Sequence, residues 1–215
     1  MKPPLSDPRL TVLDHPVVAH KIALLRAIGT DVQLFRALVH EVALLALYEA
    51  TRTLPGRAIR VSTPLEETDG VNVSGATVAI VPVLRAGLGM LDAALELLPQ
   101  APVGFIGVQR DEETLRPVPY YLNLPSGLAG RSVLVLDPML ATGGSAAHAV
   151  QLCREAGAAQ VTCVSVIAAP EGVAAVLASD PGVHIVTATL DRGLNEVGYI
   201  VPGLGDAGDR LYGTL

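Results

Sequence analysis

Near the start of the chain, apolar residues recur at the three- and four-residue spacing of helices. A first run ends at Gly29, and Asp31 can cap a second helix from residue 32 to about residue 51. The apolar positions of the first run are Val18, Ile22, Leu25 and Ile28, and those of the second are Leu34, Leu38, Val42, Leu45 and Ala46. The second set forms one stripe wide enough to lie on a sheet. The pattern therefore predicts two helices, the second of them packed on a sheet.

Residues 57–74 change to the pattern of strands. Two short runs with strand character flank the segment PLEETDG, whose Pro, Asp and Gly are typical of a hairpin turn. We therefore expect a two-stranded arm that projects from the core.

Beyond Gly75, strands and helices alternate. Three runs are apolar at nearly every position, as strands of a parallel sheet covered on both faces must be: 78–84, 133–136 and 161–168. Helices are predicted at 88–98, 144–156 and 170–178, and a further hairpin at 103–108 and 118–122. Residues from about 196 onward are rich in Gly and lack periodicity, which predicts a loop that acts as a lid or pocket wall. The alternation predicts an α/β fold.

Composition narrows the class of protein. The chain has 215 residues, of which 50% are hydrophobic and 17% charged, and its net charge is −6. The length fits one domain with an added lobe, and the low share of charged residues favours a homo-oligomer that buries part of its surface. Basic residues are scattered, which argues against a nucleic-acid groove. Neither a signal peptide nor an apolar stretch of about 18 residues is recognisable, so we expect a cytoplasmic protein.

The segment VLVLDPMLATGGS, which ends at Ser145, joins an apolar strand to a helix. Gly143 and Gly144 allow the backbone to approach a ligand closely, and the free N–H groups of a helix start attract an anion. Thr142 and Ser145 add hydroxyl donors, and Asp137 can accept hydrogen bonds from sugar hydroxyls. These features predict a sugar-phosphate site, with a plain capped turn as the alternative. Because no Lys follows the glycines, a nucleoside triphosphatase loop is disfavoured.

A second junction of strand and helix, VPVLRAGLG, carries Arg85 at its bend. The carboxyl ends of strands in open α/β sheets face the crevice where ligands bind, and a guanidinium fork suits two pyrophosphate oxygens. An arginine exposed on a loop is the alternative interpretation. Arg110, preceded by Gln109, stands at the base of the second predicted hairpin beside acidic residues, where a surface ion pair is the default interpretation.

The segment GYIVPGLGDAGDR, from Gly198 to Arg210, contains the glycine spacing of a dinucleotide-binding fingerprint. Too few residues follow for the long helix that such a fingerprint opens. The amides and carbonyls of this loop can instead hold a flat polar ring by its edges, and Asp206 is either part of that site or a turn residue. The five histidines lack ligand spacing, so no metal site is predicted.

These segments, in this order, resemble those of bacterial uracil phosphoribosyltransferases, from about His15 to Leu215. The segments that carry the likeness are PVLRAGLGM, DPMLATGGS, AAPEGV and GYIVPGLGDAGDR. The resemblance implies the type I phosphoribosyltransferase core, a mainly parallel sheet flanked by helices, with N-terminal helices, a β-arm and a C-terminal hood loop. It implies one domain: helices and arm in 1–75, a core binding phosphoribosyl pyrophosphate (PRPP) in 76–190, and a uracil-binding hood in 191–215.

The resemblance also implies roles for residues. PRPP would be bound by Arg85, Arg110, Asp137, Pro138, Met139, Leu140, Ala141, Thr142, Gly143, Gly144, Ser145 and Asp206. Arg85, Arg110 and Asp206 would be the catalytic residues. Uracil would be bound by Ile200, Gly205, Asp206 and Ala207, largely through backbone groups.

The implied reaction joins uracil to the ribose 5-phosphate of PRPP and releases pyrophosphate. Mg²⁺ would arrive on PRPP without a dedicated protein site, and two arginines would stabilise the departing pyrophosphate. Family members are often dimers or GTP-activated tetramers, so we expect a homodimer or homotetramer with GTP as a candidate activator. Two alternatives stay open, a PRPP-sensing pyrimidine regulator and a transferase for another nucleobase. Neither nucleic acid nor a membrane is an expected partner.

Overall fold

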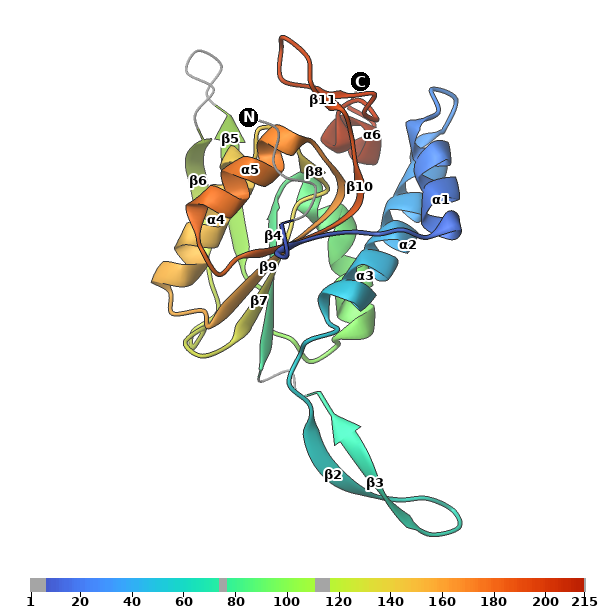
Figure 1. Ribbon diagram of the computed structural model, residues 1–215, viewed down its shortest axis with the longest axis vertical. Helices are drawn as coiled ribbons and strands as arrows, with labels where there is room; N and C mark the ends of the chain where they lie inside the picture. The colour runs from blue at the N-terminus through green and yellow to red at the C-terminus, as the bar shows by residue number, and fades with distance from the viewer. Residues whose placement is uncertain (1–6, 74–76, 111–116, 215) are drawn as a thin grey trace.

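The computed structural model describes residues 7–73, 77–110 and 117–214, whose centre is a sheet of eight strands (Figure 1). The strand order is β1 (Leu10–Val12), β10 (His184–Leu190), β9 (Gln160–Ala168), β7 (Ser132–Leu136), β4 (Val78–Leu84), β5 (Phe105–Arg110) and β6 (Pro117–Asn123). The short β8 (Met139–Leu140) also pairs with β9. Neighbouring strands are parallel except β5 and β6, which form an antiparallel hairpin. The predicted α/β fold with a mainly parallel sheet is confirmed.

Helices cover both faces of this sheet. One face packs against α1 (Pro16–Arg26), α2 (Val32–Ala50), the 3₁₀ turn η1 (Ala86–Met90) and α3 (Leu91–Leu97). The other packs against α4 (Gly144–Glu155) and α5 (Pro170–Ser179). Strand β7 shows why its sequence is apolar throughout: Leu134 and Leu136 join the first apolar cluster, and Val133 and Val135 join the second.

The predicted stripes of α1 and α2 need two corrections. Helix α1 ends at Arg26 and Ile28 is fully exposed, because the Arg210 guanidinium binds the carbonyls of Leu25 and Ala27 at 2.6 and 2.8 Å. Leu34 is 43% exposed, whereas Phe35 is buried beneath Arg210, whose guanidinium carbon lies 4.4 Å from the ring centroid. Both errors have the same cause, a contact with the distant end of the chain.

The helix predicted over 88–98 begins earlier, as the turn η1, before α3 takes over at Leu91. Two glycines permit this tight turn. A Cβ on Gly87 would lie 2.5 Å from the Leu136 carbonyl oxygen, and one on Gly89 would lie 2.8 Å from the Leu211 side chain. Turn η1 is therefore pressed against the end of β7 on one side and the end of the chain on the other.

The carboxyl-terminal residues are more ordered than the predicted loop. Strands β11 (Gly193–Leu194) and β12 (Ile200–Val201) form a small antiparallel pair, and α6 (Ala207–Tyr212) follows. Six residues are too few to show helical periodicity, but Asp206 caps the start of α6 and Gly213, at φ 68°, ends it. We call the segment from Gly193 to Thr214 the hood. Its apolar side chains Ile200, Leu204, Ala207 and Leu211 are buried in the first apolar cluster, on the face of the sheet that α1 and α2 cover.

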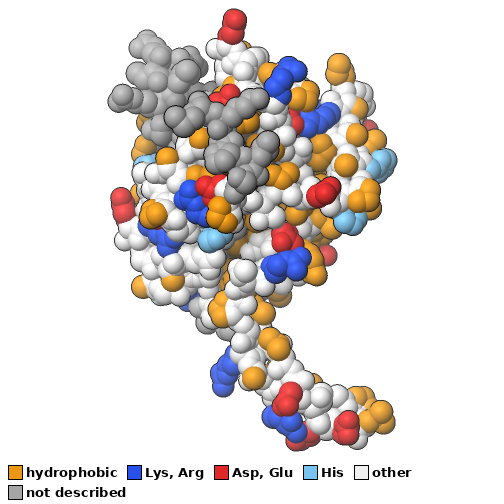
Figure 2. Space-filling view, viewed as in Figure 1, with side chains coloured by type: hydrophobic (Ala, Val, Ile, Leu, Met, Phe, Trp, Pro, Cys, Tyr) orange, Lys and Arg blue, Asp and Glu red, His pale blue; other side chains and the backbone are white. Residues whose placement is uncertain are grey.

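The predicted arm is confirmed as strands β2 (Arg57–Ser62) and β3 (Glu67–Asn72), which pair antiparallel. The arm projects from the end of the molecule that lies opposite the hood (Figure 1). Its apolar side chains Leu65 and Val71 are 95% and 74% exposed. On the face drawn in Figure 2, acidic and basic side chains are interspersed along the arm and the body. Within the described ranges, no helix combines the length and the apolar character that a membrane span needs.

Candidate active site

The loop after β7 is fixed to the sheet at both of its ends. At its start, the Asp137 N–H donates to the Val164 carbonyl at 3.1 Å. The Pro138 carbonyl then accepts from two successive amides of β9, at 3.1 and 3.0 Å, and the Leu140 carbonyl accepts from Ala169 at 2.8 Å. Asp137 thus occupies the break between β7 and β8, in a loop whose path the β9 backbone determines.

Two glycines allow this loop to lie directly against α5. Gly143 has a φ of 77°, and a Cβ there would lie 2.5 Å from the Gly172 carbonyl oxygen. In the other direction, a Cβ on Gly172 would collide with the carbonyl oxygens of Leu140 and Ala141. Backbone therefore meets backbone, and a side chain at either glycine would push the loop away from α5.

A hollow of about 40 Å³ lies in this loop, which we call the cradle. Its walls are Asp137, Met139, Ala141, Thr142, Gly143, Gly144, Ser145 and Ala146. Helix α4 begins at Gly144, so the amides of its first turn, which have no partner within the helix, lie in the wall of the hollow. A helix start with a carboxylate beside it suits a phosphate attached to a hydroxylated sugar. The structure thus collects most of the residues predicted to bind the sugar phosphate.

The carboxyl group of Asp137 is held in unfavourable surroundings for a charge. Burial raises its pKa from 3.8 to about 7, and the Met139 N–H, which donates to Oδ1 at 3.3 Å, opposes that rise only weakly. Although part of the residue is accessible, the carboxyl itself is surrounded by protein atoms. Near neutral pH it can therefore be present in both protonation states, and a ligand that donates hydrogen bonds would favour the ionised one.

Arg85 follows β4 and its side chain is exposed. The contact of Gly87 with the end of β7 places the Arg85 turn beside the strand that leads to Asp137. On its other side, the Tyr212 hydroxyl of the hood donates to the Arg85 carbonyl at 3.0 Å. The turn that carries the exposed Arg85 guanidinium is thus held by two contacts, one with the hood and one with the end of β7.

Arg110 is the last residue of β5, and its backbone pairs with Pro117 of β6. This confirms its predicted place at the base of a hairpin. Its side chain and residues 111–116 lie outside the described part of the chain, so its predicted contact with PRPP stays a prediction.

The hood presents its predicted uracil-binding residues on backbone that tight turns constrain. The Ile200 side chain is buried, and a Cβ on Gly203, at φ 67°, would collide with the Ile200 carbonyl oxygen. Gly205 is exposed with a φ of 83°. Asp206 is exposed and its Oδ1 accepts from the Asp209 N–H at 2.9 Å. Asp206 is therefore a capping residue, and its second carboxylate oxygen stays available to a ligand.

Sequence patterns missed the contacts that join the hood to the rest of the site. The Leu194 N–H faces the Glu171 carboxylate at 3.4 Å, in the same first turn of α5 that supports the cradle. The Asp191 carboxylate accepts hydrogen bonds from Arg26 of α1 and from the Gly203 N–H of the hood. An acidic residue directly after a strand was a usable signal for Asp191, as it was for Asp137. No local signal identifies Arg26.

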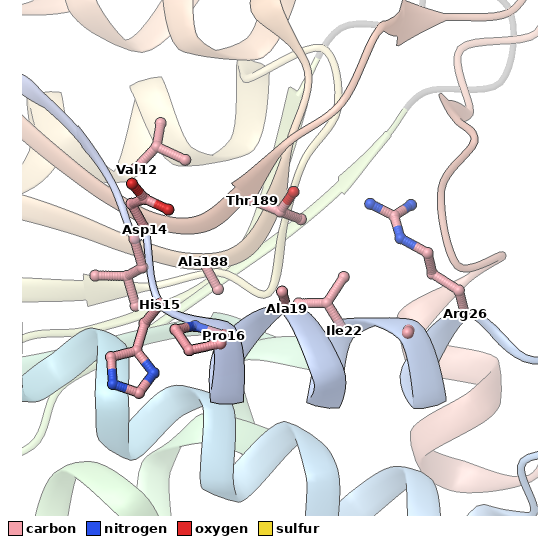
Figure 3. A pocket seen from close by; sticks show the side chains of 11 residues that line it. Val12, Asp14, His15, Pro16, Ala19, Ile22, Arg26, Ala188 and Thr189 are labelled. Atoms are coloured by element: carbon pink, nitrogen blue, oxygen red, sulfur yellow. The ribbon is translucent and has the colours of Figure 1, made fainter.

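A larger hollow of about 450 Å³ lies between α1 and the end of β10 (Figure 3). Its described lining runs from Val12 and His15 to Arg26 and Thr189 and includes none of the residues predicted to bind PRPP or uracil. In the close-up, Arg26 extends from the last turn of α1 at the opposite end from His15. We place the candidate active site at the smaller cradle, because backbone amides line it together with the Asp137 carboxyl, whose pKa is raised. Among the described residues, no three side chains of His, Cys, Asp or Glu gather as a metal site.

Comparison with known proteins shows which family the chain resembles. The family model described as Uracil phosphoribosyltransferase matches residues 12–214. The uracil phosphoribosyltransferase of Thermoanaerobacter sp. strain X514 is 54% identical over 203 residues, 94% of this chain and 97% of that protein. The structure of the AQ2163 protein from Aquifex aeolicus has 38% identity and a TM-score of 0.90, covering 94% of this chain and 97% of the other. Adenine phosphoribosyltransferase from Trypanosoma brucei, at 14% identity, covers 94% of this chain and 90% of the other with a TM-score of 0.58, and shares the fold.

We expect Asp137→Asn to remove a pH dependence from the stability of the unliganded protein. The folded-state pKa of about 7 lies above the ordinary 3.8, so folding favours the protonated acid. The stability that this proton contributes is fully present below about pH 4 and is lost as pH rises through about 7. Relative to the Asn variant, wild type should lose at most about 4 kcal/mol over that range, and less where solvent screens the charge. Urea unfolding of both proteins at about pH 5 and pH 8 measures this. If the free energies of unfolding of wild type and variant differ by the same amount at both pH values, the prediction is wrong.

Proposed function

This chain belongs to the uracil phosphoribosyltransferase family, and we propose that its cradle, its Arg85 turn and its hood divide the binding of the two substrates between them. The enzyme is a pentosyltransferase that joins uracil to PRPP, giving UMP and pyrophosphate. The observation that carries the division is the cradle, where a helix start, a glycine turn and the Asp137 carboxyl line one small hollow.

In this proposal the 5-phosphate of PRPP lies in the cradle. The amides of residues 142–145 and the hydroxyls of Thr142 and Ser145 donate to its oxygens. The ribose hydroxyls donate to Asp137, which accepts both most strongly when it is ionised. Its pKa of about 7 makes that ionised state accessible near neutral pH, at the cost of releasing a proton when PRPP binds below pH 7.

The departing pyrophosphate would be stabilised by Arg85 and Arg110. Displacement at the anomeric carbon builds positive charge on the ribose and negative charge on the leaving oxygens, so fixed cations near those oxygens lower the barrier. Mg²⁺ would enter as part of the substrate, held mainly by PRPP oxygens. Asp137 is the acidic residue in the lining of the cradle, which fits the preference of Mg²⁺ for one or two carboxylates together with substrate oxygens.

Uracil would be read by the hood backbone at Ile200, Gly205 and Ala207, with Asp206 beside it. The O4 acceptor and N3 donor of uracil then meet fixed partners. Backbone donors to the ring oxygens would also stabilise the anion that forms when N1 loses its proton. The buried Ile200 side chain holds this backbone to the core, which supports the assignment of recognition to main-chain atoms.

The homo-oligomer predicted from composition is supported by the arm. A two-stranded hairpin with Leu65 and Val71 in water buries little apolar surface of its own, and a second copy of the chain would cover those side chains. Activation by GTP and a cytoplasmic location stay predictions from the sequence.

Release of pyrophosphate with uracil, cytosine, guanine and xanthine tests the proposed recognition. Cytosine reverses the hydrogen-bonding pattern at both read positions, so we expect kcat/KM for uracil to exceed that for cytosine by about 10⁴ or more. Ile200→Ala should weaken uracil binding modestly and keep the preference, because it removes a core contact but no reading atom. Comparable values for the two bases in wild type would refute the pocket. PRPP binding without conversion of any base would favour the regulator instead.

Arg85→Ala should lower kcat/KM for PRPP by about two orders of magnitude or more, because a charge that stabilises the leaving group is lost. Arg85→Lys should recover only part of this activity, since a point charge cannot replace the fork. Arg52→Ala is the matched control, because Arg52 is also exposed but pairs with Glu49 at the end of α2. If Arg85→Ala behaves like Arg52→Ala in steady-state kinetics, Arg85 is a simple loop residue.

A further inference from the structure

The Asp191 carboxylate lies at a junction of three segments. Its residue directly follows β10 and is 7% exposed, and its backbone N–H donates to the Ala168 carbonyl at the end of β9 at 2.8 Å. Its carboxylate accepts from both terminal nitrogens of Arg26 in the last turn of α1, with Nη1 to Oδ2 at 2.7 Å. Oδ2 also accepts from the Gly203 N–H of the hood at 2.8 Å. One buried acid thus joins the sheet, α1 and the hood.

Arg26 closes this junction into a ring. The same Nη1 that binds Asp191 donates to the Gly203 carbonyl at 2.9 Å. Both polar groups of the Gly203 backbone are therefore held, the N–H by the acid and the carbonyl by the base. Such charge-assisted hydrogen bonds fix direction as well as distance, so this residue of the hood has little freedom to shift.

Gly203 lies between the two stretches of backbone proposed to read uracil, Ile200 on one side and 205–207 on the other. At Gly203 the chain turns so sharply that a Cβ would collide with the Ile200 carbonyl. Because only two residues separate Gly203 from Ile200, a displacement of Gly203 is transmitted to the Ile200 backbone. On the other side, Arg210 holds the Leu204 carbonyl at 2.9 Å and the Leu25 carbonyl at 2.6 Å, next to Arg26. The end of α1 is thus the support on which the turn of the hood rests.

We propose that Arg26 and Asp191 are positioning residues for uracil recognition, which set the place of the hood backbone through Gly203 without contacting either substrate. This inference rests on the proposed function, because it assigns a role in the same uracil site. The cradle is held by different contacts, with β9 and with Gly172. Loss of the Arg26–Asp191 pair should therefore affect uracil and leave PRPP binding almost unchanged.

The chain contains a closely matched control for the general effect of losing a partly buried ion pair. Asp180 also follows a regular element, accepts from Arg154 at 3.0 Å, and accepts from a glycine amide, that of Gly182, at 2.8 Å. Its partners are α4 and the loop before β10, away from the hood. Asp180→Asn removes the same charge from the same kinds of donor, an arginine and a glycine amide, so it reports stability without a change in uracil recognition.

The test compares Asp191→Asn, Arg26→Lys and Asp180→Asn with wild type in steady-state assays. PRPP binding is measured separately by calorimetry without uracil. We expect Asp191→Asn to raise the uracil KM by about tenfold or more, since the carboxylate charge and one of its two acceptor oxygens are lost. Arg26→Lys keeps the charge but not the fork, so its uracil KM should lie between those of wild type and Asp191→Asn. The PRPP dissociation constant should stay within about twofold in each variant, and Asp180→Asn should keep the wild-type uracil KM within the same margin.

Two results would overturn the inference. One is a uracil KM in Asp191→Asn no higher than in Asp180→Asn, and the other is an equal loss of affinity for both substrates. If Asp191→Asn does not fold, Arg26→Lys decides alone, by the same comparison of uracil KM with PRPP affinity. Wild type in the same assay separates this inference from the proposed function. Without uracil conversion in wild type the function itself fails, whereas normal conversion with an unchanged KM in the variants rejects only the positioning role.

Discussion

The contact of backbone with backbone between the cradle and α5 is the constraint on which the site depends. Gly143 and Gly172 leave no room for a Cβ between the two segments, and β9 fixes the loop on its other side. A loop held in this way keeps its amides in fixed positions, so the phosphate that we propose to bind there would meet groups that are already in place. The same loop determines where Asp137 lies, in buried surroundings that raise its pKa.

The hood is held by a different kind of interaction. Its two-residue strands and six-residue helix have little core of their own, and side chains of other elements complete their hydrogen bonds. Arg26 and Arg210 bind carbonyls of the hood and of α1, and Tyr212 joins the hood to the Arg85 turn. Glu171 and Gly172 lie next to each other in α5, so one helical turn contacts both the hood and the cradle. The first turn of α5 is thus one support that the hood and the cradle share, and the Arg26–Asp191 pair supports the hood separately.

Much of this arrangement follows from local sequence. The apolar strands, helix α2 with its Asp31 cap, the arm and the strand-to-helix turn of the cradle all have signals within a few residues. What local patterns missed depends on partners far along the chain. Ile28 is exposed because Arg210 binds the end of α1, and α6 forms because Asp206 caps a segment too short for periodicity. Arg26 and Asp191 lie far apart in the sequence, so no local spacing pattern indicates that they form an ion pair.

A crystal structure of the enzyme with UMP tests the central claim most directly, because UMP carries both the phosphate and the base. The account predicts phosphate oxygens within hydrogen-bonding distance of the backbone N–H groups of residues 142–145. It also predicts that the O4 and N3 edge of uracil faces main-chain atoms of Ile200 and of residues 205–207. A phosphate bound away from the cradle, or a uracil edge held by side chains alone, would contradict it.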